Sequence, residues 1–193
     1  MNKGDKITFG QYPQGENGEV LPLRWRVLDV QGDKALLLTD KLIDGRRYHG
    51  KFVDVTWETC ALRKWLNGSF FKKAFSREEQ SKIASVTHST PDNPSYGTTG
   101  GNPTQDNIFL LSIDEVEGYF SSGSERKAYA TPYAETQGCY VDKADGGSWW
   151  WLRSSGDYHY YAALVFSNGD VSYSGTNVRL NRGTVRPALW LNL

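Results

Sequence analysis

The chain has 193 residues, enough for one domain that buries its core without disulfides or metals. Its 22 Lys+Arg balance its 22 Asp+Glu, so no net charge draws it to nucleic acid or to an anionic membrane, and we expect neither partner. Aromatic residues make up 13% of the chain beside 20 glycines, which is typical of an α+β protein of strands and long loops and argues against a helix bundle.

The first seven residues lack the apolar core of a signal peptide, and no run of about twenty apolar residues could span a bilayer. We therefore expect no membrane insertion and a cytoplasmic location, with a phage particle as the other possibility. Cys60 and Cys139 occur in unrelated contexts, so we expect two reduced thiols, Cys60 being the less accessible. The three histidines are isolated and no metal-binding spacing occurs, so we expect no metal and no cofactor.

In chain order, residues 7–12 read as a strand that Pro13 ends or places at a sheet edge. Residues 21–30 and 34–40 predict a hairpin around Gly32, and the leucine-rich second strand is expected to be central.

Three helical segments follow. The first is predicted over residues 57–66, with Thr56 as its cap and Asn67-Gly68 as its stop, followed by a helical turn over residues 69–75. A further helix should start at Ser76, whose capping-box partner is Glu79, and reach about Val86.

Residues 88–107 are polar and rich in proline, which leaves two alternatives: an ordered loop beside a binding face, or a mobile excursion without function. Residues 108–111 then predict a buried strand, residues 112–120 a capped helix, and residues 128–134 a short helix. The acidic residues of these helices are interpreted as solvent-facing: Glu78, Glu79, Asp114, Glu115 and Glu117.

The C-terminal part contrasts an apolar frame with a polar, aromatic filling. Trp149, Trp150 and Trp151 are expected in the core, and Arg153 and Arg186 are expected to pair internally. Inside the frame, residues 162–165 and 171–174 predict a hairpin around the turn at residues 167–170. Alternation along it should direct Val165 and Val171 inward and Phe166, Ser172 and Ser174 outward.

Several motifs together resemble a bacterial and phage domain family related to the C-type lectin and formylglycine-generating-enzyme folds. They are Phe9-Gly10-Gln11-Tyr12-Pro13, Trp25-Arg26-Val27-Leu28, Leu62-Arg63-Lys64-Trp65-Leu66-Asn67, Phe109-Leu110-Leu111-Ser112, Trp150-Trp151-Leu152-Arg153-Ser154 and Val185-Arg186-Pro187-Ala188-Leu189-Trp190-Leu191-Asn192-Leu193. The resemblance covers residues 7–193 and implies one C-type-lectin-like domain over residues 1–193. Similar proteins include the variable proteins of diversity-generating retroelements, which display a hypervariable ligand-binding surface near the C-terminus.

That resemblance can be tested on residues 154–185. Mutation of template adenines in AAC-type asparagine codons cannot yield Lys, Glu, Gln, Met or Trp, and all five are absent from this segment. The positions that such mutation could have produced are Asp157, Tyr158, His159, Tyr160, Tyr161, Leu164, Phe166, Asn168, Asp170, Ser172, Tyr173, Ser174, Thr176, Asn177, Arg179, Leu180, Asn181 and Arg182. The intervening fixed lattice would be Gly156, Ala162, Ala163, Val165, Gly169, Val171, Gly175, Val178 and Gly183.

The sequence therefore predicts a non-enzymatic protein that binds a protein or other macromolecule through this segment. The predicted contact residues are Asp157, Tyr158, His159, Tyr160, Tyr161, Phe166, Asn168, Ser172, Tyr173, Ser174, Asn177, Arg179 and Asn181. Tyrosine offers rigid contact area while Ser and Asn adapt their hydrogen bonds. Three alternatives remain: tyrosines that merely edge a core, an oxidase resembling the formylglycine-generating branch, whose cysteine pattern Cys60 and Cys139 do not match, and a structural domain of a phage particle or other assembly.

Overall fold

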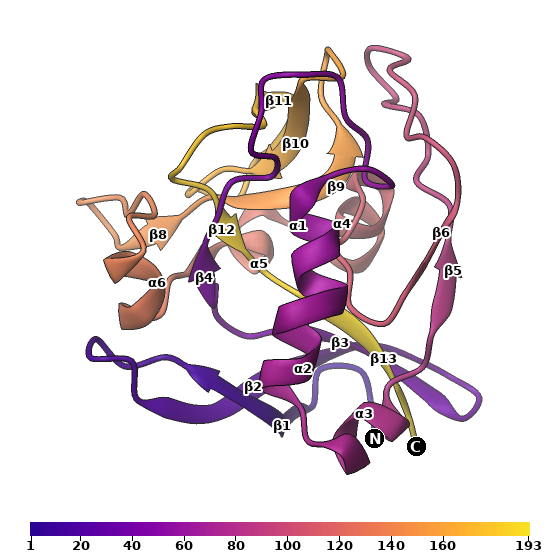
Figure 1. The fold of residues 1–193 in the computed structure, drawn as a ribbon, viewed down its shortest axis with the longest axis vertical. Coiled ribbons are helices and arrows are strands. Elements are labelled where there is room, and N and C mark those ends of the chain that lie inside the picture. The colour runs from indigo at the N-terminus through magenta and orange to yellow at the C-terminus, as the bar shows by residue number, and fades with distance from the viewer.

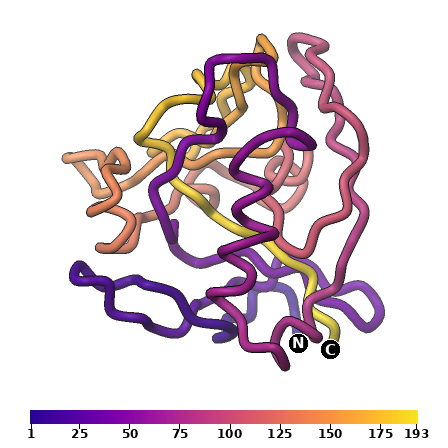
Figure 2. Tube along the Cα trace, in the orientation of Figure 1, coloured from indigo at the N-terminus to yellow at the C-terminus, as the bar shows by residue number.

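The computed structural model describes residues 1–193, and its first sheet joins the two ends of the chain. Its strands are ordered β1-β2-β3-β13, all antiparallel, and the N- and C-termini lie side by side (Figures 1 and 2). The bounds are β1 (Lys6–Pro13), β2 (Val20–Gln31), β3 (Lys34–Thr39) and β13 (Ala188–Asn192). The predicted first hairpin, its central second strand and the edge position of Pro13 are confirmed.

A second sheet carries the C-terminal segment, with strand order β11-β10-β9-β12-β4. Its strands are β4 (Asp44–Gly45), β9 (Trp150–Ser155), β10 (Tyr161–Val165), β11 (Val171–Asn177) and β12 (Thr184–Val185). All neighbours are antiparallel except β12 and β9. The predicted hairpin is confirmed as β10 and β11, and β11 lies at the free edge of the sheet.

Short helices and two small strand pairs fill the space around the sheets. The helices are α1 (Ala61–Trp65), the π-helix η1 (Leu66–Phe70), α2 (Phe71–Ala74), α3 (Arg77–Lys82), α4 (Ile113–Tyr119), α5 (Gly123–Arg126) and α6 (Pro132–Thr136). The pairs are β5 (Val86–His88) with β6 (Thr104–Asp106), and β7 (Ala128–Tyr129) with β8 (Gly147–Ser148). The fold is thus mixed α+β, dominated by antiparallel sheets. None of its helices has the length and apolarity needed to cross a membrane.

The first predicted helix differs from the observed one at both ends. It begins at Ala61, where the Cys60 thiol accepts a hydrogen bond from the Arg63 N–H at 3.3 Å, so Thr56 is not its cap. Nor does it stop at Asn67-Gly68, because α1, η1 and α2 follow without a break (Figure 1). The Asn67 amide donates to the carbonyl of Ile108 at 2.8 Å, so it binds a neighbouring segment and does not end the helix.

Other element predictions are confirmed in part. The capping box predicted at Ser76 with Glu79 forms, and the helix predicted to be capped near residue 112 has a capping box of Ser112 with Glu115. α3 ends at Lys82, short of the predicted Val86, which belongs to β5. Residues 108–111 are buried as predicted but make only one bridge, Phe109 to Ala188. Residues 128–134 divide into β7 and the start of α6, which Thr131 caps.

One apolar cluster of 42 buried residues connects the two sheets, and it contains the three consecutive tryptophans as predicted. Arg186 is 1% exposed and bonds to the carbonyls of Thr39 and Arg126, while its guanidinium lies 4.9 Å from the Trp150 ring centre. Burial lowers the pKa of Arg186 to about 9. The expected internal pairing is confirmed for Arg153, which binds Glu115, whereas Arg186 has carbonyl partners and no carboxylate.

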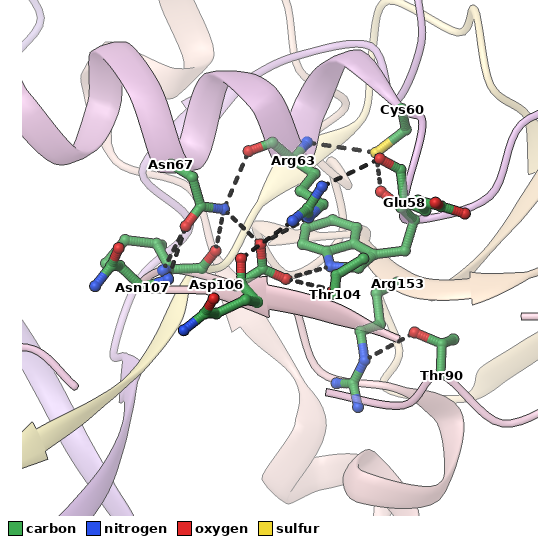
Figure 3. Close-up of polar contacts among 12 residues, drawn as sticks. Glu58, Cys60, Arg63, Asn67, Thr90, Thr104, Asp106, Asn107 and Arg153 are labelled. Carbon is green, nitrogen blue, oxygen red and sulfur yellow. Dashed lines mark hydrogen bonds and ion pairs between the residues drawn. The ribbon is translucent and has the colours of Figure 1, made fainter. Parts of the chain in front are cut away.

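The buried carboxylate of Asp106 connects the continuous helical run α1, η1 and α2 to the polar segment before α4. Asp106, 1% exposed, accepts from the Arg63 Nε at 2.6 Å and from the Trp57 Nε1 at 2.9 Å. Thr104 and Asn67 donate to the same carboxylate, at 2.7 and 3.1 Å. Figure 3 shows Arg63 and Asn67 reaching from the helix to this one group. Asp106 therefore fixes the position of the segment that leads into α1.

Candidate ligand-binding surface

Three segments that are distant in sequence meet at one end of the second sheet. They are residues 46–55 after β4, residues 156–160 between β9 and β10, and residues 178–183 between β11 and β12. The N–H of Val178 donates to the Tyr160 carbonyl at 3.1 Å, and the N–H of His49 donates to the Val178 carbonyl at 2.8 Å. The N–H of Val55 donates to the His159 carbonyl at 2.9 Å. Backbone hydrogen bonds therefore hold the three loops together, and we call this region the loop surface.

Exposed aromatic rings cover part of the loop surface. Tyr158 and Tyr160 stack with ring centres 5.1 Å apart and an interplanar angle of 3°. Tyr161 meets Tyr160 edge-on at 5.1 Å, and Phe52 lies 4.7 Å from the same ring. Tyr158 is 54% and Phe52 49% exposed, and Tyr160 and Tyr161 are partly exposed. They form a contiguous aromatic patch that is open to solvent.

Most predicted contact residues are accessible. Five are exposed: Tyr158, Phe166, Asn168, Arg179 and Asn181. Seven are partly exposed: Asp157, His159, Tyr160, Tyr161, Tyr173, Ser174 and Asn177. The predicted lattice shows the opposite tendency, since it is buried at Gly156, Ala162, Ala163, Val165, Gly169, Val178 and Gly183 and partly exposed at Val171 and Gly175. Accessible and buried positions thus alternate along the segment much as the residue types do.

Two positions of the variable set are buried. The prediction that Ser172 points outward is wrong, because it is 6% exposed and lies opposite the buried Leu164 in the β10–β11 register. Its Oγ accepts from the Gly175 N–H at 3.1 Å, beside a break in the register. Gly175 has φ of +69°, and a Cβ there would lie 2.2 Å from the Ala162 carbonyl oxygen. Ser172 therefore supports a bend in the strand that only glycine fits at position 175.

The predicted contact residues do not all lie on the loop surface. Phe166 and Asn168 lie in the hairpin turn, where the Arg126 Nε donates to the Gly169 carbonyl at 2.8 Å. β10 has five residues, so roughly 15 Å divide this turn from the loop surface. Tyr173 instead directs its hydroxyl to Glu117 of α4. A single binding face is therefore built from the loop surface without these three residues.

The polar residues 89–103 form a loop that packs against the base of the loop surface; that this surface binds a ligand stays a prediction. The Asn93 amide, 2% exposed, donates to the carbonyls of Ser155 and Tyr173 at 2.9 and 2.8 Å. The Thr98 hydroxyl donates to the Asp157 carbonyl at 3.0 Å. Nothing in the sequence pattern distinguishes Asn93 from its polar neighbours, so this role could be found only in three dimensions.

Replacing Asn93 by Ala should loosen the loop, since the carbonyls of Ser155 and Tyr173 lose a donor, in a buried bond and a part-buried bond respectively. We expect the free energy of unfolding to fall by about 1–3 kcal/mol. Amide hydrogen exchange should also accelerate in residues 89–103 and at Asp157. Asn102, whose amide bonds only to the Glu58 side chain at the surface, provides the control, because Asn102→Ala should leave both properties nearly unchanged. Equal effects of the two substitutions would contradict the role of Asn93.

Basic residues line a hollow beside the aromatic patch. It measures about 380 Å³ and its lining comprises Arg47, Asn177, Arg179, Leu180, Asn181 and Arg182. Arg47 donates its Nε–H to the Asn181 Oδ1, joining two of the three loops. Neither Arg47 nor Phe52 belongs to the segment that the sequence singled out, because both come from the loop after β4.

Both thiols lie in environments that favour the protonated form. Burial raises the pKa of Cys60 to about 12, and this thiol caps α1. Burial followed by the charge of Glu135 raises the pKa of Cys139 to about 11. Neither is poised as a nucleophile at neutral pH. The loop surface itself presents aromatic contact area, amide hydrogen-bonding groups and positive charge.

A search of curated proteins and a search of solved structures gave no match to this chain. One protein-family model matches residues 32–193, a range that includes the loop surface and the second sheet but leaves out β1 and β2 of the first sheet. The chain therefore belongs to the family described as Domain of unknown function (DUF6273).

Proposed function

We propose that the protein is a non-enzymatic binding protein whose loop surface contacts a protein or other macromolecule. The observation that carries this proposal is the difference in exposure along residues 156–183. Positions with Tyr, His, Asn and Arg are mostly accessible, while the interspersed Gly, Ala and Val are mostly buried. Such a segment can change its surface chemistry without changing its packing.

We further propose that the fold is C-type-lectin-like and that the segment is diversified by a retroelement. The antiparallel sheets, short flanking helices and long loops are compatible with this scaffold. The absence of Lys, Glu, Gln, Met and Trp from residues 154–185 supports the second part, because mutation of AAC-type codons at adenines avoids these residues. The buried Leu164 and Ser172 would then be positions where variation is limited by packing.

The aromatic patch supports recognition of a macromolecule. Tyrosine and tryptophan dominate binding energies at interfaces because each buries a large area at a small cost in conformational entropy. Tyr158, Tyr160 and Phe52 present such area around a centre that hydrogen-bonded backbone holds in place. A partner that covers this patch would remove its apolar surface from water.

Selection from a displayed library of random twelve-residue peptides tests the proposal. Peptides recovered on the wild-type protein should bind the Tyr158→Ser, Tyr160→Ser double variant at least about tenfold more weakly, because the loss of two contact rings removes at least about 1.4 kcal/mol. Tyr129→Ser is the matched control, since Tyr129 is 48% exposed and lies on β7. The proposal fails if no peptide is recovered, or if the double variant and the control bind the peptides equally well.

A further inference from the structure

The loop surface holds three arginines that have no acidic partner. Arg47, Arg179 and Arg182 are all exposed, and none takes part in any of the ion pairs of the protein. In contrast, the neighbouring Arg46 is paired with Asp44 at 3.1 Å and covers the Trp65 ring. The protein as a whole has a formal net charge of +0, so the three guanidinium groups form a local excess of positive charge.

The backbone around these arginines is fixed while the side chains of two of them remain available. Asn177 accepts from the Arg179 N–H at 2.9 Å, and the Arg182 carbonyl accepts from the Tyr140 N–H at 3.1 Å. The guanidinium groups of Arg179 and Arg182 make no hydrogen bond within the protein. All three arginines line the same hollow of about 380 Å³. Guanidinium groups bind carboxylates with paired hydrogen bonds, so the hollow suits a carboxylate.

The basic hollow adjoins the aromatic patch. Tyr161 is the register partner of Asn177, a residue that lines the hollow. On the second side, the loop after β4 carries both Arg47 and Phe52, whose ring packs on Tyr160. A ligand that lies across both areas would meet positive charge at one end and apolar rings at the other.

Negative charge limits what such a ligand can be. Asp54 and Asp157 lie near the tyrosines. The pKa of Tyr160 is raised by burial, by the neighbouring Tyr158 and Tyr161, and by the charges of these two carboxylates. A nucleic-acid backbone carries a charge at every nucleotide and would meet these carboxylates after leaving the arginines. A polypeptide can carry carboxylates at one end and apolar side chains at the other, so its charges can match this surface.

We infer that the loop surface binds an acidic segment of a protein, with Asp or Glu side chains in the arginine hollow and an apolar side chain on Phe52, Tyr158 and Tyr160. This inference rests on the proposed binding function and names the chemistry of its partner. Arg47 lies outside the segment predicted to vary, whereas Arg179 and Arg182 lie inside it. The scaffold therefore supplies part of the preference for acidic partners, and the varying segment adjusts it.

Peptide selection on two proteins tests the inference. Twelve-residue peptides selected on the wild type should be enriched in Asp and Glu relative to the starting library. The Arg47→Gln, Arg179→Gln, Arg182→Gln variant should bind them about tenfold more weakly, and added salt should narrow that difference. An Arg24→Gln, Lys72→Gln, Arg77→Gln variant loses the same charge from other exposed, unpaired positions and should bind within about twofold of the wild type.

Each other outcome has a distinct meaning. Peptides that depend on Tyr158 and Tyr160 but lack acidic residues, or that bind both triple variants equally, would overturn the acidic partner and leave the binding function intact. A twelve-nucleotide single strand that binds more tightly than the peptides through the three arginines would show that the hollow recognises phosphate, which also overturns it. If no peptide is recovered, both the function and its acidic partner are contradicted.

Discussion

Replacing Asp106 by Ala should lower the free energy of unfolding by about 3–5 kcal/mol, as measured by chemical denaturation. Four side-chain donors converge on this carboxylate, so its removal leaves Arg63 without an ion-pair partner and Trp57 without an acceptor. The Arg63 side chain is only 21% exposed, so water replaces the lost partner poorly. Asp106→Asn should lose less, because the amide oxygen still accepts hydrogen bonds.

The matched control is Asp40, whose ion pair with Lys6 has side chains 22% and 47% exposed. Surface pairs of this kind contribute up to about 1 kcal/mol, so Asp40→Ala should have a small effect. A loss at Asp106 no larger than the loss at Asp40 would contradict the view that this buried network holds α1 against β6.

His88 should make the protein less stable as the pH falls from 7 to 4. Burial and then the positive charge of Arg153 lower the pKa of His88 to about 4, while an unfolded histidine titrates near 6.5. Between these two pH values His88 is protonated in the unfolded chain and neutral in the folded protein. The free energy of unfolding therefore rises with pH across this window. The difference between the two pKa values corresponds to about 3 kcal/mol of stability, which is present at pH 7 and lost near pH 4.

His88→Leu removes this titration and places an apolar side chain near Phe109, whose ring centre lies 3.9 Å from that of His88. The free energy of unfolding should therefore fall about 3 kcal/mol less in the variant between pH 7 and pH 4, as followed by denaturation at a series of pH values. Curves for the two proteins that run parallel would show that His88 is not buried in its neutral form.

Local patterns predicted the elements whose formation depends on nearby residues. The N-terminal hairpin follows from alternation and a turn glycine, and the capping box of α3 follows from Ser76 three residues before Glu79. The Asn67-Gly68 stop was wrong because Asn67 bonds to residues about forty positions away, which no local rule includes. The same limit applies to Glu115, predicted to face solvent but paired with Arg153.

The pKa of Glu115 reflects that buried contact. Burial alone would raise it, but the charge and hydrogen bonds of Arg153 and the N–H of Ser112 outweigh burial and lower the pKa. The sequence alone could not reveal this pairing, because a glutamate in the first turn of a helix is also the expected capping-box residue.

The candidate site was predictable in its composition and only partly in its geometry. Residues 157–161 were predicted to be contact residues together with Asn177, Arg179 and Asn181, and the two groups do meet on one surface. Phe166 and Asn168 were grouped with them by sequence, yet the length of β10 places them at the opposite end of the hairpin. Arg47 and Phe52 were missed because a separate loop brings them to the surface through backbone hydrogen bonds.

The most direct test of a surface built to vary is the sequence of this gene and its neighbourhood in related isolates. Differences among isolates should concentrate in codons for the accessible positions of residues 157–182 and spare the buried Gly156, Ala162, Ala163 and Val165. A near-copy of the region encoding residues 154–185, differing at adenines, should lie beside a reverse transcriptase gene. Differences spread equally over buried and accessible positions, with no such copy, would contradict the account.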